Sequence, residues 1–148
     1  MNRLVKAALV GGLISGALDI AAASLIFHAN VGRVLQTVAS GFYGRAAYQM
    51  GTASMLVGAL AQEAITVVAA SLYCIASLSW PALRKQWLVF GLLYGAVCNL
   101  VMTFVVVPHS HARPTAFGSY GFWVNLAINT LLYGTVIAFA AKRFLGRK

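Results

Sequence analysis

Acidic residues are almost absent from this chain: of its 148 residues, only Asp19 and Glu63 are aspartate or glutamate. Charged residues of both signs make up 9% of the sequence, whereas a typical soluble domain has about 25%. Hydrophobic residues make up 61%, so a water-facing surface cannot be built from this composition. The sequence therefore indicates an integral membrane protein, and its length suits one domain covering residues 1–148.

Cysteine and catalytic motifs are also scarce. Both cysteines, Cys74 and Cys98, lie within apolar runs, where a free thiol behaves as a small apolar side chain. They provide neither a disulfide framework nor the spacing of a metal site. The chain has no glycine-rich phosphate loop and no recognisable nucleophile–base motif. We therefore expect neither an enzyme nor a cofactor.

The net charge of +9 raises the question of nucleic-acid binding. Nucleic-acid-binding domains gather lysine and arginine on one polar face. Here the 11 basic residues stand in small groups between long apolar runs. That distribution is typical of charges that set membrane topology, so nucleic acid is not an expected partner.

Several stretches are long and apolar enough to cross a bilayer as a helix, which needs about 20 residues. They are Ala7–Phe27, Thr52–Ala76, Trp87–Val107 and Tyr120–Ala141. Lys6 and Lys142 bracket the outermost pair, and Pro108 follows the third stretch, where a helix is expected to end. The predicted fold class is an all-α membrane protein, a bundle of four transmembrane helices.

Basic residues near the span ends predict the orientation, because lysine and arginine collect on the cytoplasmic side. One side holds Arg3, Lys6, Arg84, Lys85, Lys142, Arg143, Arg147 and Lys148. The other side holds only Arg33, Arg45 and Arg113. We therefore expect a multi-pass protein of a bacterial inner membrane, with both termini in the cytoplasm.

The first outer loop, His28–Gly51, carries a helical pattern of its own. Its apolar residues recur at helical spacing, at Val31, Val34, Leu35, Val38 and Phe42. This predicts an amphipathic helix in the outer membrane interface that ends near residues 41–44. Such a helix would either pack the bundle as a cover or act as a lid over a cavity that opens outward.

Two Gly-x-x-x-Gly motifs, Gly12/Gly16 and Gly91/Gly95, lie in the first and third spans. Glycine lets a neighbouring helix approach closely, and lipid cannot replace the resulting van der Waals contact. We therefore predict that both motifs are packing faces. Asp19 follows the first motif and Asn99 the second, so a parallel internal duplication stays open.

Both acidic residues fall near the middle of the bilayer. At a helix rise of ~1.5 Å per residue, Asp19 lies about 18 Å from the cytoplasmic end of its span, and Glu63 about 17 Å from the outer end of its own. Asn99 and Asn129 come at similar depths in the other spans, and Gln62 is a near neighbour. Each span thus contributes a polar side chain to one layer.

No lysine or arginine lies at this depth. An ionised carboxylate there costs about 2.5–3.5 kcal/mol, so we expect one or both acids to be protonated at rest. Three interpretations stay open: a proton- or cation-coupled site for a small solute, polar contacts that only specify helix pairing, or pairing with a basic residue of a partner subunit. The first interpretation also predicts a homo-oligomer, because a bundle of four helices leaves little room for a cavity within a single chain.

The histidines His28, His109 and His111 all fall on the outer side. Three imidazoles are the minimum for an open zinc site, and two can face each other across a haem. No cysteine, aspartate or glutamate on that side would complete a coordination sphere. We therefore favour interfacial histidines over a metal site.

In topology alone, the chain resembles the uncharacterised small four-span proteins of bacterial inner membranes. No diagnostic motif carries this resemblance, so it implies no site residues. Small multidrug exporters also have four spans and a membrane-embedded glutamate, and they work as dimers. This chain is longer, has its glutamate in the second span rather than the first, and adds the outer-loop helix.

The alternative to this topology is a cleaved signal peptide, with Arg3 and Lys6 as its charged region and residues 21–23 before the cleavage site. Cleavage would leave three spans and place the C-terminus on the wrong side for its charges. We predict instead that the first span is retained, and that mass spectrometry of the purified protein finds the native N-terminus. A mature chain beginning near Ser24 would contradict the predicted topology.

Overall fold

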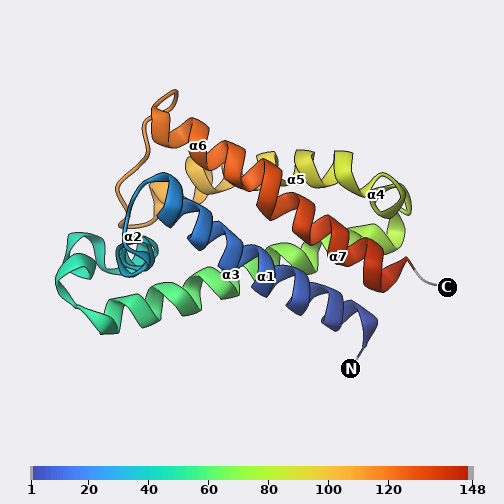
Figure 1. The fold of residues 1–148 in the computed structure, drawn as a ribbon, viewed down its shortest axis with the longest axis horizontal. Helices are drawn as coiled ribbons and strands as arrows, with labels where there is room; N and C mark the ends of the chain where they lie inside the picture. Colours follow the sequence, from blue (N-terminus) through green and yellow to red (C-terminus); the bar gives the residue numbers. More distant parts are fainter. Residues whose placement is uncertain (1, 147–148) are drawn as a thin grey trace.

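The computed structural model describes residues 2–146, and all of its regular structure is helical, with no strand in that range. Arg147 and Lys148, counted above among the basic residues, lie outside the described residues. Four helical segments are long and apolar enough to cross a membrane: Arg3–Ile26, Thr52–Ser79, Trp87–His109 and Tyr120–Leu145. The predicted all-α bundle of four transmembrane helices is therefore confirmed (Figure 1).

The first two spans are the single helices α1 (Arg3–Ile26) and α3 (Thr52–Ser79). The third consists of α5 (Trp87–Val101), the π-helical turn η2 (Met102–Val106) and the 3₁₀ turn η3 (Val107–His109). The fourth consists of α6 (Tyr120–Ile128), the π-helical segment η4 (Asn129–Gly134) and α7 (Thr135–Leu145). The connections contain α2 (Val31–Tyr43), the 3₁₀ helix η1 (Gly44–Gln49) and the short α4 (Ala82–Lys85).

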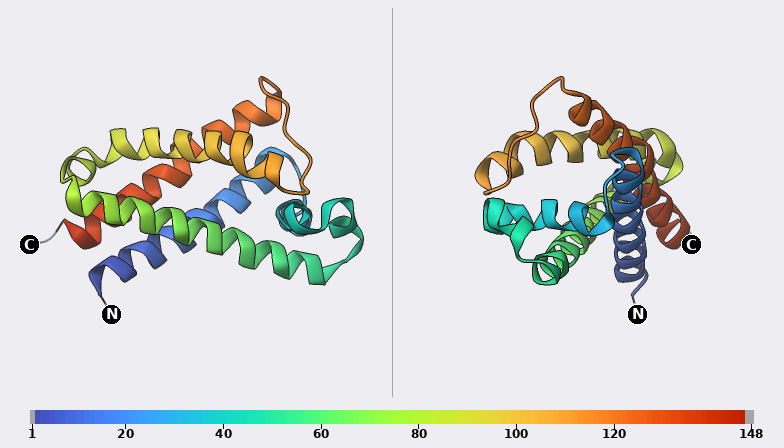
Figure 2. Two further views of the ribbon diagram at one scale, coloured as in Figure 1. Left: turned by 180° about the vertical axis from the view of Figure 1, so that it is seen from behind. Right: turned by 60° about the vertical axis from the view of Figure 1, so that its left-hand side comes forward.

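The spans alternate in direction, so the described ends of the chain lie together with α4 at one end of the bundle (Figures 1 and 2). We call this the terminal end. The opposite end, which carries α2, η1 and the connection between η3 and α6, is the loop end. Helix α1 contacts both α3 and α7, and α5 packs against η4 and α7.

Glycines set the spacing between α1 and its neighbours. A methyl group added to Gly12 would lie 2.7 Å from the Cα atom of Val67 in α3. One added to Gly11 would lie 2.9 Å from the Cβ atom of Ala140 in α7. Both separations are shorter than carbon atoms tolerate, so α1 reaches this depth against two helices only because these positions lack a side chain.

The contact between α5 and the fourth span is closer still. A methyl group on Gly95 would overlap the carbonyl oxygen of Asn129, and one on Gly134 would overlap the carbonyl oxygen of Gly91. The face of α5 that carries Gly91 and Gly95 therefore lies directly on the backbone of η4.

Large apolar side chains point mainly out of the bundle. Leu60 and Leu72 of α3, for example, are 72% and 60% exposed, whereas the packed interior consists mostly of small and aromatic residues. That interior contains Ala7, Ala70, Tyr73, Cys74, Tyr133, Ile137, Ala138 and Ala141. A soluble protein buries its large apolar side chains instead. The outward placement seen here fits a surface solvated by hydrocarbon.

Helix α2 confirms the helix predicted in the first outer loop, and it packs tightly on α3. Its buried residues are the small or polar Gln36, Ala39 and Ser40, whereas Val31 and Phe42 are 49% and 60% exposed. The apolar residues at the two ends of the predicted stripe thus turn away from the bundle, because the surrounding solvent is lipid and small side chains allow the closest packing.

We predict that Gly58→Ala destabilises the protein, because the added methyl group would overlap the carbonyl oxygen of Leu35 in α2. The expected loss is about 1–3 kcal/mol of unfolding free energy, typical of overpacking. Thermal unfolding in detergent, followed by circular dichroism at 222 nm, a standard wavelength for helix content, measures it. Gly121→Ala is the matched control, because its methyl group meets no atom closer than 3.7 Å. Equal stability of the two variants would contradict the packing of α2 on α3.

Candidate functional site

The two acids lie within their spans, nearer the loop end than the terminal end. At ~1.5 Å per residue, Asp19 is about 24 Å from the start of α1 and about 10 Å from its end. Glu63 is about 16 Å from the start of α3, which lies at the loop end, and about 24 Å from its other end. Asn99 and Asn129 also lie well inside the third and fourth spans. All four side chains therefore lie inside the candidate spans, with Asp19 about two helical turns from the loop end of α1.

Asp19 has a partner on the next span. The side-chain amide nitrogen of Gln62 in α3 donates a hydrogen bond of 2.8 Å to the Oδ2 atom of Asp19 in α1. Both residues are only part-buried within the single chain. This bond joins α1 to α3 at the depth where lipid offers no competing donor.

Glu63, next to Gln62 in the sequence, lies against α1 without such a partner. A methyl group on Gly16 would stand 2.9 and 3.0 Å from its two carboxyl oxygens. Its Oε2 atom is buried and accepts no hydrogen bond from any described residue. The nearby hydroxyl of Thr66 donates to the backbone carbonyl of Glu63, at 3.0 Å. The carboxyl group of Glu63 thus lies against α1 with its Oε2 atom unsatisfied, although the residue as a whole is only part-buried.

The chain also supplies no cation at this depth. No lysine or arginine occurs between Lys6 and Arg33, or between Arg45 and Arg84. The same is true between Lys85 and Arg113, and between Arg113 and Lys142 in the last span. Both acids must therefore be neutralised by a proton, by a bound cation or by another molecule.

A second polar pair joins the third and fourth spans. The side-chain nitrogen of Asn129 donates to the Oδ1 atom of Asn99 at 3.4 Å and to the carbonyl oxygen of Asn125 at 2.9 Å. Asn99 is only 3% exposed, and its own Nδ2 atom has no hydrogen-bond partner among the described residues. The side-chain nitrogen of Asn99 is therefore a buried donor without an acceptor in the described chain.

The predicted layer therefore consists of two pairs, Asp19–Gln62 and Asn99–Asn129, each between consecutive spans. The helices that carry the two pairs are neighbours, because α1 contacts η4. Within residues 2–146, no hydrogen bond joins one pair to the other.

Sequence reasoning missed the π-helical segment η4, which begins at Asn129. Hydrogen bonds from side chains to the backbone mark both of its ends: Asn129 donates to the Asn125 carbonyl, and the Thr135 hydroxyl donates to the Leu131 carbonyl at 2.6 Å. Polar side chains that compete for helix carbonyls were the available signal. π-Helical turns occur often at functional sites.

The outer histidines are not gathered into a metal site. Within the described part of the chain, no group of three or more histidine, cysteine, aspartate or glutamate side chains is placed to hold a metal ion. The Nδ1 atom of His109 hydrogen-bonds the carbonyl oxygen of Val105. The backbone N–H of His111 donates instead to the Gly41 carbonyl of α2, at 3.0 Å.

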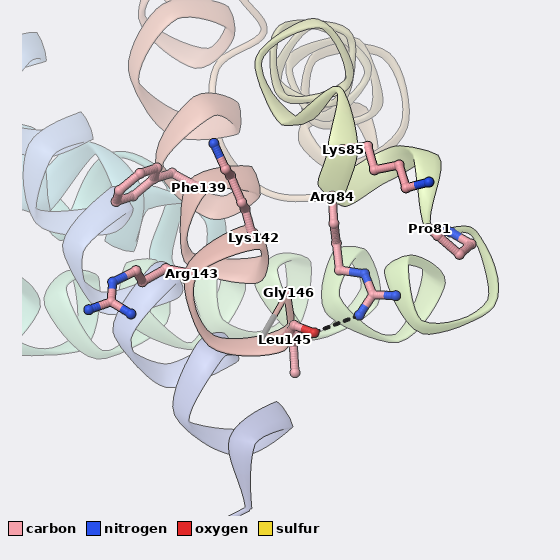
Figure 3. Close-up of a pocket in the computed structure, with 8 residues that line it drawn as sticks. All are labelled: Pro81, Arg84, Lys85, Phe139, Lys142, Arg143, Leu145 and Gly146. Carbon is pink, nitrogen blue, oxygen red and sulfur yellow. Dashed lines mark hydrogen bonds between the residues drawn. The ribbon is translucent and has the colours of Figure 1, made fainter. Parts of the chain in front are cut away.

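A basic pocket of about 680 Å³ lies at the terminal end, between α4 and α7 (Figure 3). Its cations are Arg84, Lys85, Lys142 and Arg143. Arg84 donates to the carbonyl oxygen of Leu145 at 2.7 Å, and Lys142 lies over the ring of Trp87. Figure 3 shows Lys85 and Arg143 pointing in opposite directions. The charges diverge, as expected for a belt of cations at helix ends.

Comparisons with protein-family models, with curated proteins and with solved structures found no match. The functional argument therefore rests on the side chains of this chain. Two of these side chains, Glu63 and Asn99, have a buried atom without a hydrogen-bond partner among the described residues, and Glu63 is the one of the two that can ionise.

We predict that Asp19 and Gln62 are energetically coupled. A double-mutant cycle with Asp19→Ala and Gln62→Ala should give a coupling free energy of about 0.5–2 kcal/mol, the range of interhelical hydrogen bonds in membranes. Unfolding in mixed micelles with increasing SDS measures it. Asp19→Ala combined with Ser77→Ala is the control and should be additive, because Ser77 hydrogen-bonds within α3 and lies about 22 Å along that helix from Gln62. A coupling near zero for the first pair would contradict the hydrogen bond.

Proposed function

We propose that this integral membrane protein takes up and releases a proton or small cation at Asp19 and Glu63, and couples that exchange to the binding or passage of a small solute. The observation that carries the proposal is the buried Oε2 atom of Glu63, which has no hydrogen-bond donor and no counter-charge in the described chain. Intramembrane acids in this situation commonly serve ion and proton pathways.

Polar contacts that only specify helix pairing explain Asp19 but not Glu63. The Asp19–Gln62 bond is what such a role requires, since each polar group satisfies the other. Glu63 gains nothing comparable from α1, and an apolar residue against Gly16 would pack there without the cost of burying a carboxyl group. The retained acid is therefore better explained by exchange of a proton or cation than by packing.

The remaining polar residues would line the same site. The side-chain nitrogen of Asn129 donates to the Oδ1 atom of Asn99. The side-chain nitrogen of Asn99 therefore remains available as a donor. Asp19 and Glu63 are only part-buried in one chain, so a second copy would complete the enclosure. We therefore propose a homo-oligomer in a bacterial inner membrane, with the basic terminal end in the cytoplasm.

A second candidate is an accessory subunit whose partner supplies a basic residue to these acids. The absence of any lysine or arginine between Lys6 and Arg33, or between Arg45 and Arg84, leaves both acids without a basic residue nearby in their own helices and favours it. Such a partner would bind on an outward-facing surface of the bundle, since Gly12, Gly16, Gly91 and Gly95 already contact helices of this chain. Purification from native membranes in mild detergent separates the candidates: a stoichiometric foreign protein supports this one, and a homo-oligomer supports the first.

The first candidate predicts that Glu63→Gln and Asp19→Asn abolish proton or cation flux in proteoliposomes. Flux is driven by a potassium gradient with valinomycin and followed with a pH-sensitive dye inside the vesicles, and with sodium or potassium indicators in parallel. Both substitutions keep the side-chain size but remove the exchangeable charge. Ser71→Ala, which alters a hydroxyl bonded only within α3, is the matched control and should retain flux. Wild-type flux in both acid variants would rule out the proposal.

A further inference from the structure

All three arginines of the loop end converge on one pocket. Arg33 comes from α2, Arg45 from η1 and Arg113 from the connection between η3 and α6. Together with Ser40, Gly44, Tyr48 and His111, they line a pocket of about 500 Å³. No other lysine or arginine of the described chain belongs to this end.

The pocket is held by contacts between segments far apart in the sequence. The hydrogen bond from the His111 backbone N–H to the Gly41 carbonyl fixes the later connection against α2. Gly44 adopts a φ of 57° at this turn, a left-handed backbone conformation that favours glycine. The guanidinium of Arg33 stacks over the ring of Tyr48 at 4.0 Å, an arrangement that orients the group while leaving its N–H donors available.

This cluster lacks any internal explanation. Arginines on the side away from the termini oppose the charge bias that orients membrane proteins, so topology does not account for them. No carboxylate can neutralise them either, because the only acids of the chain, Asp19 and Glu63, lie within the spans. All three arginines are exposed, so water screens their mutual repulsion, but an anion in the pocket would be attracted by all three at once.

We infer that the loop-end pocket binds a phosphate group through Arg33, Arg45 and Arg113. The planar guanidinium fork matches the oxygens of a phosphate. The hydroxyls of Ser40 and Tyr48 also line the pocket, but they already donate to the carbonyl and hydroxyl oxygens of Thr37, so the arginines supply the donors. The phosphate belongs either to the headgroup of an anionic phospholipid or to a soluble phosphorylated solute, since the pocket lies where the bundle meets the membrane surface. This inference does not depend on the acidic residues of the spans.

The terminal-end pocket offers a matched comparison within the same chain. It holds Arg84, Lys85, Lys142 and Arg143, yet Arg84 is bonded to the Leu145 carbonyl, and Lys85 and Arg143 point apart in Figure 3. Removing two cations there changes the net charge by the same amount as removing two at the loop end, so the comparison separates a built site from general attraction to anions.

The test uses the full chain in nanodiscs, with Arg45→Gln/Arg113→Gln as the site variant and Lys85→Gln/Arg143→Gln as the control. In phosphatidylcholine discs, inorganic phosphate is titrated by calorimetry. In discs that contain phosphatidylglycerol, lipid retention is counted by native mass spectrometry. We expect binding in at least one arm, weakened by about tenfold or more in the site variant and by less than about twofold in the control.

The two arms identify the source of the phosphate. Binding of inorganic phosphate supports a soluble ligand, and retention of phosphatidylglycerol alone supports a lipid headgroup. Absence of binding in both arms, or equal loss in the two variants, would overturn the inference. Arg45 and Arg113 are exposed, so the site variant should fold; size-exclusion profile and helicity check this, and Arg45→Lys/Arg113→Lys, which keeps the charge, should restore part of the affinity.

Discussion

The structure depends on backbone contact between helices. In a bilayer, apolar side chains gain little by leaving lipid, so helices associate through close fit and polar bonds. Here Gly11 and Gly12 allow α1 to pack closely against α7 and α3. Gly91 and Gly95 allow α5 to pack directly on η4. The polar layer follows from the same contacts. Because Gly16 has no side chain, the carboxyl group of Glu63 can lie directly against α1.

Two buried atoms of the polar layer have no hydrogen-bond partner among the described residues. One is an acceptor, the Oε2 atom of Glu63, and the other is a donor, the Nδ2 atom of Asn99. Native proteins leave few such groups, because each costs the full free energy of its lost hydration. The two lie in different helix pairs, on either side of the contact between α1 and η4. A binding role gives both groups a use that packing alone does not.

Sequence patterns predicted the four spans and α2, because apolar length and helical periodicity are local properties. The helix rise also predicts comparable depths for Asp19, Glu63 and the two asparagines. What the patterns could not give was the rotation of each helix about its axis, which long-range packing decides. The pairing of Asp19 with Gln62, and the isolation of Glu63 beside it, depend on that rotation. The meeting of Arg33, Arg45 and Arg113 depends on how two distant connections fold onto each other.

The separation of charges along the bundle gives the chain a characteristic electrostatic profile. Cations gather at both ends, and the two aspartate and glutamate side chains of the sequence lie between them. A hydrated metal ion approaching from either surface meets repulsion before it meets a carboxylate. A proton is not restricted in the same way, because it passes between neutral donors and acceptors without carrying a hydration shell. For the proposed exchange at Asp19 and Glu63, this profile favours protons over metal cations, and it attracts anions to both surfaces.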